Sequence, residues 1–138
     1  MLFRSGDTSW TNYALSAWVD LTNLGGGLAL LGRVVDSAHY YHLSIQRDGS
    51  GNPAWFLMKR DGDSWTLLGS GSLNYAAGTW VKLRLTMSGS TLRAEYSTDG
   101  TAFTVLGSAT DTRYAAGKIG LRSWTAAAYF DEVLVQGV

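Results

Sequence analysis

The chain has 138 residues, a length typical of one domain, and 46% of them are hydrophobic, enough to bury a core without disulfides or metals. The formal net charge is +0 and the lysines and arginines are scattered, which argues against a nucleic-acid partner because phosphate binding needs a basic surface. The absence of cysteine excludes disulfides, thiolate metal sites and cysteine nucleophiles.

Alternation of apolar and polar residues with period two runs through the chain and indicates β-strands. In residues 12–21, Leu15, Ala17 and Val19 share one face, and Trp18 lies on the other. The two clearest strands are expected at 80–87 and 91–96, joined by the Ser-Gly-Ser turn at 88–90. Helical periodicity is not sustained anywhere in the sequence.

Asp-Gly pairs at 48–49, 61–62 and 99–100 predict tight turns, because glycine adopts positive φ without steric cost. The sequence Tyr-Ala-Ala-Gly occurs at 75–78 and again at 114–117, and we expect a helical turn ended by a glycine cap at both places. Short strands joined by glycine turns favour an all-β fold, a two-sheet antiparallel β-sandwich in one domain, 1–138.

Several short segments follow one another over nearly the whole chain: Ser9-Trp10-Thr11-Asn12-Tyr13, Gly32-Arg33-Val34 with Tyr40-Tyr41, Gly78-Thr79-Trp80, Thr98-Asp99-Gly100, Gly117-Lys118-Ile119-Gly120-Leu121 and Phe130-Asp131-Glu132-Val133. In this order and spacing, they together resemble the concanavalin A-like/laminin G superfamily. The resemblance is to non-catalytic modules of bacterial polysaccharide-degrading enzymes. It implies a jelly-roll sandwich and a module excised from a larger secreted bacterial protein.

Such domains usually begin with a further strand or two, whereas only residues 1–8 precede the Trp-Thr-Asn-Tyr segment here. We therefore expect either a shortened sheet or an open edge that another copy completes, giving a homo-oligomer. No basic-then-apolar leader precedes Phe3, so a secretion signal is expected outside this chain. No run approaches the roughly 20 apolar residues of a membrane span, and no membrane partner is expected.

The acidic residues do not predict an enzyme. Sandwich glycosidases need clustered acids, but the only glutamates are Glu95 and Glu132. Glu95 is expected on the surface, paired with Arg84 or Lys82 of a neighbouring strand. His39 is expected in a loop and His42 on a strand surface, three residues apart and therefore on opposite faces, so they do not simply share a metal.

The resemblance also implies a structural calcium near the start of the last strand, with Asp131 as a ligand. Carboxylate and carbonyl oxygens suit this hard cation. Companion ligands in relatives usually come from the N-terminal segment, which is short here. The alternative for Asp131 is to cap a turn or pair with an arginine.

Sugar binding needs an aromatic face for the ring and planar polar groups for its hydroxyls. We expect ligand contacts where an arginine is joined to aromatic residues: at Arg33, which alternates with Leu31 and Val35 and so lies toward a partly buried face, and at Tyr40, Tyr41, Arg122, Trp124, Trp18 and Tyr129. The alternative is structural: Arg33 pairs with Asp36 or Asp20, and Trp124 closes a sheet end. Trp10 and Trp65, beside turns, are expected to close the ends of the sandwich.

The sequence thus predicts a carbohydrate-binding module that brings a secreted glycan-degrading enzyme to its polysaccharide, without chemistry of its own. One alternative is a laminin G-like interaction or scaffold domain that binds no glycan. A second is a small glycoside hydrolase or lyase with an unfamiliar site.

Overall fold

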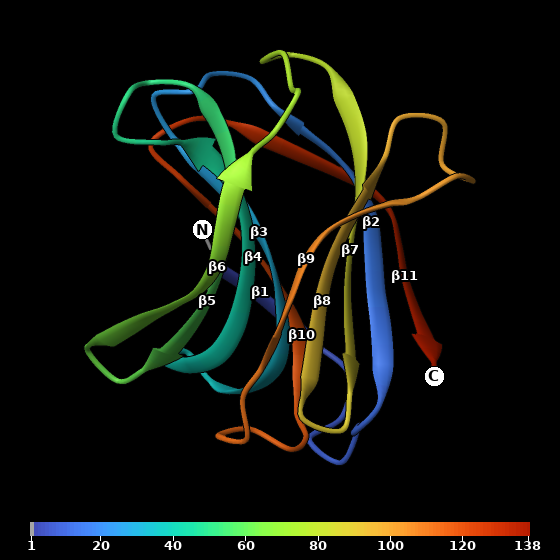
Figure 1. Cartoon of the computed structure of the whole chain (residues 1–138). Helices are drawn as coiled ribbons and strands as arrows, with labels where there is room; N and C mark the ends of the chain where they lie inside the picture. The colour runs from blue at the N-terminus through green and yellow to red at the C-terminus, as the bar shows by residue number, and fades with distance from the viewer. Residues whose placement is uncertain (1) are drawn as a thin grey trace.

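The computed structural model describes residues 2–138 and is built from strands and turns alone. Figure 1 shows two layers of strands facing one another, with the chain termini on different layers. The strands are β1 (Leu2–Ser5), β2 (Tyr13–Leu21), β3 (Gly27–Asp36), β4 (His39–Arg47), β5 (Pro53–Asp61), β6 (Ser64–Ser72), β7 (Trp80–Ser88), β8 (Thr91–Ser97), β9 (Thr104–Thr110), β10 (Lys118–Trp124) and β11 (Ala128–Gly137).

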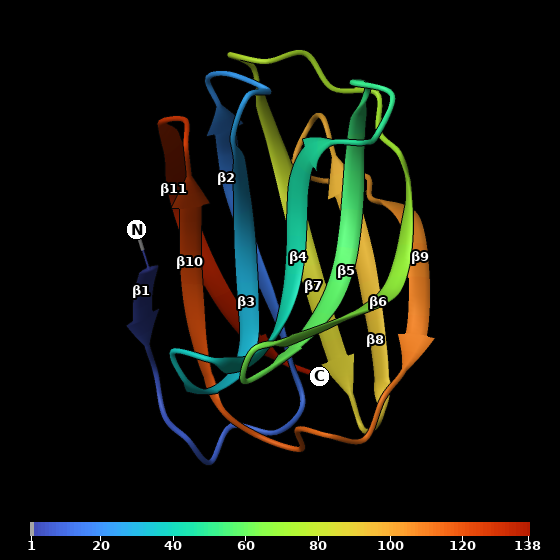
Figure 2. The same ribbon diagram turned by 90° about the vertical axis from the view of Figure 1, so that its left-hand side faces the viewer.

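The two layers are antiparallel sheets. The six-stranded sheet has the order β1-β10-β3-β4-β5-β6 and the five-stranded sheet the order β11-β2-β7-β8-β9. Figure 2 shows the six-stranded sheet face on, with β10 between β1 and β3 although β10 comes late in the chain. The predicted two-sheet antiparallel sandwich is confirmed.

The core lies between the sheets and follows the alternation seen in the sequence. Leu15, Ala17 and Val19 of β2 face inward at 0% exposure, opposite Leu85, Leu83 and Val81 of β7 in that register. Each large apolar side chain buried in this way stabilises the fold by about 1.5–3 kcal/mol. The strands predicted at 80–87 and 91–96 are present as β7 and β8.

Turns join the strands at all three Asp-Gly pairs, but at 48–49 the positive φ is taken by Gly51, at 84°, and not by Gly49. Gly62 and Gly100 take φ of 67° and 86°, which explains the glycine at each position. The helical turns expected at 75–78 and 114–117 are absent from the described residues. Residues 76–79 form a turn closed by the bond from the Thr79 N–H to the Ala76 carbonyl, and Gly78, at φ 81°, donates to the Leu21 carbonyl.

A short strand, β1, precedes the Trp-Thr-Asn-Tyr segment and pairs with β10 at the edge of the six-stranded sheet. Its side chains at Leu2 and Phe3 are 37% and 51% exposed. The oligomer predicted through an open edge stays a prediction. Among residues 2–138 there is no helix long and apolar enough to span a membrane.

Candidate functional site

A row of three side chains crosses the outer face of the six-stranded sheet, the face away from the core. Register places Tyr40 of β4 opposite Arg60 of β5, and Arg60 opposite Trp65 of β6. The Arg60 guanidinium carbon lies 5.9 Å from the Tyr40 ring centroid and 5.3 Å from that of Trp65. Trp65 is 38% exposed and therefore presents an indole surface to solvent. Trp65 was expected to close a sandwich end, and that prediction is wrong.

Trp124, at the end of β10, lies across the neighbouring strand β3 on the same face. Its register partner is Gly27, and a Cβ built on Gly27 would sit 2.1 Å from Trp124 Cζ2. The missing side chain is what lets the indole lie over β3. Trp124 then reaches β4 and stacks on His42, with ring centroids 5.7 Å apart and 28° between the planes.

His42 is 2% exposed, although it faces away from the core. Trp124 stacks on the imidazole, and Trp65 packs edge to face against it with ring centroids 5.3 Å apart. The two indoles therefore shield His42 from solvent. Neither ring nitrogen of His42 has a hydrogen-bond partner among the described residues. Burial, together with the charges of Arg122 and Arg60, lowers the pKa of His42 to about 3. The prediction that His42 is a surface residue is wrong.

Arg122 lies between two indoles. Its guanidinium carbon is 5.0 Å from the ring centroid of Trp124 and 5.5 Å from that of Trp65. Such contacts hold the flat guanidinium against the ring faces while its N–H groups stay available. The prediction that Arg122 and Trp124 share a face is confirmed by their positions on β10, two residues apart.

These side chains form one unit, which we call the arginine–aromatic cluster: Tyr40, His42, Arg60, Trp65, Arg122 and Trp124. A hollow of about 250 Å³ lies on it. Its lining combines indole surface, a guanidinium and a carboxamide, and consists of His42, Gln46, Met58, Trp65, Arg122 and Trp124. The cluster collects residues from four strands, β10, β4, β5 and β6, in one place.

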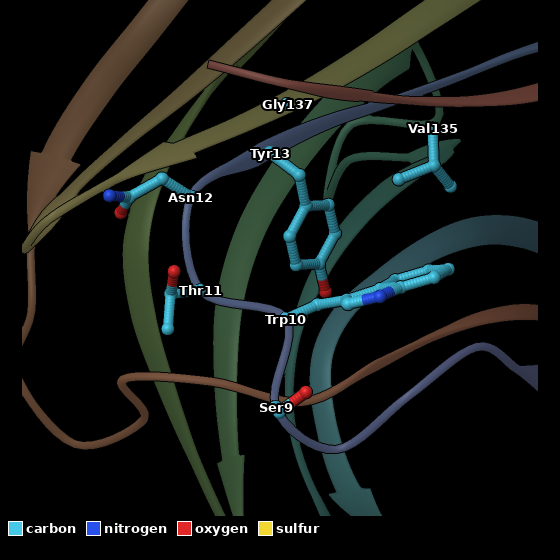
Figure 3. Close-up of a pocket in the computed structure, with 7 residues that line it drawn as sticks. All are labelled: Ser9, Trp10, Thr11, Asn12, Tyr13, Val135 and Gly137. Carbon is cyan, nitrogen blue, oxygen red and sulfur yellow. The ribbon is translucent and has the colours of Figure 1, made fainter.

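A larger hollow, about 420 Å³, lies where the segment before β2 meets the end of β11 (Figure 3). Figure 3 shows the rings of Trp10 and Tyr13 side by side and Asn12 pointing away from them; the two rings meet edge to face at 6.0 Å. Two polar groups here already have partners: Asn12 Oδ1 accepts the Gly89 N–H, and the Tyr13 hydroxyl accepts the Arg33 N–H. The lining that the described residues give this hollow contains no charged side chain, whereas the hollow on the arginine–aromatic cluster is lined by Arg122.

Arg33 is a structural residue. It is 1% exposed, and its guanidinium donates to the carbonyls of Thr11 (3.0 Å), Gly89 (2.7 Å) and Tyr114 (3.0 Å). The backbone at Arg33 bulges out of β3 with φ 47°, a conformation that costs an arginine roughly 1–2 kcal/mol and that these bonds offset. Neither of the expected partners, Asp36 or Asp20, contacts it. Its donors are directed at backbone carbonyls, not at a free surface.

The remaining predicted contact residues lie apart from the cluster. Tyr41, next to Tyr40, points into the core and its hydroxyl donates to Asp111 at 2.7 Å. Trp18 and Tyr129 lie on the outer face of the five-stranded sheet, on the opposite side of the sandwich: Tyr129 is opposite Asp20, and the loop at Gly100 packs on Trp18. Of the seven predicted residues, Tyr40, Arg122 and Trp124 come together.

Asp131 lies on β11 opposite Trp18 and is exposed, and its Oδ1 accepts the N–H of Glu132. Within residues 2–138, no three acidic or histidine side chains are grouped so that they could hold a metal. The side chains around Asp131 therefore do not assemble a calcium site by themselves. The calcium ion stays a prediction, one that would need backbone carbonyls as its other ligands.

Glu95 pairs with Arg84, as predicted, and also with Arg93, but it is buried at 3% exposure and not at the surface. Burial raises its pKa, yet hydrogen bonds from Arg84 and Arg93 outweigh burial and hold the pKa below the ordinary value. An acid kept ionised by two arginines is poorly suited to donate a proton to a leaving group.

The chain is similar to known proteins both in sequence and in fold. Residues 22–127 match the family described as "Beta xylosidase C-terminal Concanavalin A-like domain". Comparison with curated proteins gave no match.

Among solved structures, the carbohydrate-binding module CBM66 from Bacillus subtilis superposes with a TM-score of 0.79 at 16% identity, over 99% of this chain and 81% of that one. The Bacteroides ovatus xyloglucan PUL GH43B protein superposes with a TM-score of 0.68 at 20% identity. This chain, 93% of it aligned, spans only 28% of that protein's length. Galectin-Ib from Xenopus laevis gives a TM-score of 0.70 at 11% identity, over 99% and 98% of the two chains. These likenesses show a common fold.

Proposed function

The chain belongs to the family of β-xylosidase C-terminal concanavalin A-like domains, and from that premise we propose that it is a carbohydrate-binding module whose site is the arginine–aromatic cluster. The observation that supports this most directly is Arg122 held between Trp65 and Trp124, with no hydrogen-bond partner for its guanidinium among residues 2–138. A sugar ring lies with its C–H face on an indole while its hydroxyls accept hydrogen bonds from the guanidinium.

The site suits binding better than catalysis. The hollow on the cluster has no carboxylate in its lining, and the buried Glu95 belongs to the other sheet. Joined to a catalytic domain, the module raises the local concentration of the enzyme on its polymer. In line with the family and with relatives several times longer, we propose that this chain works as part of a larger secreted bacterial enzyme.

The test is a glycan array followed by affinity gels with soluble polysaccharides, comparing the native protein with Trp124→Ala. We expect the substitution to abolish retardation of the protein in the gel. Trp80→Ala is the matched control, because Trp80 is a 46% exposed indole on the five-stranded sheet. A silent array, or equal losses from both substitutions, would contradict the proposal.

A second candidate function is a domain that packs against another protein domain. The observation in its favour is the apolar surface of β11, where Val133 and Leu134 are 41% and 42% exposed. Replacing both with serine would relieve self-association or free a partner domain, and would leave a glycan site on the six-stranded sheet intact.

A further inference from the structure

The arginine–aromatic cluster holds two positive charges without a carboxylate partner. Neither Arg60 nor Arg122 forms an ion pair within residues 2–138, whereas Arg84, Arg93 and Arg113 all do. The two guanidinium groups approach the same indole, at 5.3 and 5.5 Å from the Trp65 centroid. Ring faces cover part of each group and reduce its contact with water.

The two arginines are held differently. Arg60 is fixed in place, because its Nε donates to the Gly62 carbonyl and its Nη1 to the Ser37 carbonyl and the Tyr40 hydroxyl. Within residues 2–138, the Arg122 guanidinium interacts with ring faces and makes no hydrogen bond, so its planar fork of donors is available to a ligand. Arg60 therefore contributes charge, and Arg122 contributes both charge and hydrogen bonds.

The rest of the hollow does not supply a counter-charge. His42, Gln46 and Met58 are its other non-indole lining residues, and none carries a negative charge. His42 is neutral above a pKa of about 3, since burial and both nearby arginines oppose its protonation. A neutral sugar would leave the two guanidinium charges uncompensated, whereas an anion would pair with them at close range in a partly desolvated place.

We propose that the glycan bound at this cluster is anionic: a sugar whose ring stacks on Trp65 and Trp124 and carries a carboxylate or a sulfate that Arg122 binds. This inference rests on the proposed function and adds the chemical class of the sugar. A planar carboxylate or a sulfate accepts two parallel hydrogen bonds from one guanidinium, which a single hydroxyl cannot do.

The experiment compares pairs of polymers that share a backbone, one member charged and the other neutral. Calorimetric titration at low salt would use polygalacturonate against its methyl ester, and dextran sulfate against dextran. We expect the acidic member of at least one pair to bind at least about tenfold more tightly, because charged hydrogen bonds are stronger than neutral ones. The difference should shrink as sodium chloride screens the charges.

Arg122→Gln should reduce binding of the acidic polymer to the level of its neutral partner. Arg47→Gln is the matched control, since Arg47 is an exposed arginine at the end of β4 outside the cluster. Preference for polygalacturonate alone assigns the anion as carboxylate, and preference for dextran sulfate alone assigns it as sulfate. Equal binding of the charged and neutral members of both pairs, with Trp124→Ala abolishing it, would overturn this inference and keep the proposed function. No binding to any of these polymers, together with a silent glycan array, would overturn both.

Discussion

The indole of Trp124 stacks on the imidazole of His42 with ring centroids 5.7 Å apart, although β3 lies between their strands and the two residues are far apart in the sequence. The stack exists because β3, the strand between them, has Gly27 and Ala29 on its outer face. A larger residue at Gly27 would leave Trp124 no room over the sheet. The small residues of β3 therefore determine where Trp124 lies in the proposed binding site.

Gly27→Ala should therefore damage the site without touching any ligand. Its Cβ would overlap Trp124 Cζ2 at 2.1 Å and displace the indole from His42. We expect a loss of stability of about 1–3 kcal/mol, typical of overpacking, together with loss of glycan binding. Denaturant unfolding followed by tryptophan fluorescence measures the first, and affinity gels measure the second. Gly49→Ala, where an added Cβ meets open space, should change neither. Unaltered binding by Gly27→Ala would show that the position of Trp124 is unimportant.

His42 should make the fold sensitive to mild acid. Its pKa is about 3 when folded and about 6.5 when unfolded. A depressed pKa in the folded state means that the unfolded chain takes up the proton first, so stability is complete above pH 6.5 and falls as the pH drops towards 3. The slope attributable to His42 is up to about 1.4 kcal/mol per pH unit.

The measurement is urea unfolding of the native protein and His42→Phe between pH 7 and pH 4.5. Phenylalanine keeps an aromatic ring under Trp124 but does not titrate. We expect the difference in free energy of unfolding between the two proteins to shift in favour of the variant as the pH falls. A difference that stays constant over this range would show that His42 protonates equally well in the folded protein.

Arg33→Ala should unfold the protein or weaken it severely. The substitution removes the donors to the carbonyls of Thr11, Gly89 and Tyr114, of which Tyr114 is buried, and it leaves a cavity where the 1% exposed Arg33 side chain lay. We expect a cost of about 3 kcal/mol or more in the free energy of unfolding.

Arg33→Lys keeps the charge but lacks the fork of donors, and it should still be destabilised. At a temperature where Arg33→Lys remains folded, its affinity for the glycan should equal that of the native protein, because Arg33 lies outside the arginine–aromatic cluster. Weakened binding by a fully folded Arg33→Lys protein would return Arg33 to the ligand site.

Glu95→Gln tests the ion pairs of the five-stranded sheet. Glutamine keeps the shape of Glu95 but weakens its bonds with Arg84 and Arg93, of which the Arg93 Nε bond is 2.9 Å long. We expect the free energy of unfolding to fall by about 1–3 kcal/mol, since hydrogen bonds to charged groups contribute that much. Thermal unfolding measures the change. Glycan binding should be unaltered, and a loss of binding in the folded variant would place a ligand on this sheet as well.

Much of the site could be predicted only in pieces. The period-two pattern predicted that Arg122 and Trp124 share one face of their strand. It also predicted that Leu83 and Leu85 share the apolar face of theirs, because side-chain direction alternates along any strand. Arg60 was missed since the pattern of β5 alone does not distinguish it from other surface arginines. Trp65 was assigned to a sandwich end because its neighbours in sequence form a turn.

The sequence by itself determined that this chain is an all-β sandwich, which face of its most regular strands points inward, and that aromatic residues and arginines occur together on the other faces. The alternation of side-chain direction is a local property of a strand, so it can be recognised in the sequence without knowledge of the fold. Only the tertiary structure decided which sheet each outward residue belongs to: Trp18 and Trp124 both point away from the core, yet they lie on opposite sides of the molecule. Strand order and register bring Trp124, His42 and Trp65 together, and a bulge turns Arg33 inward, through contacts between residues far apart in the chain.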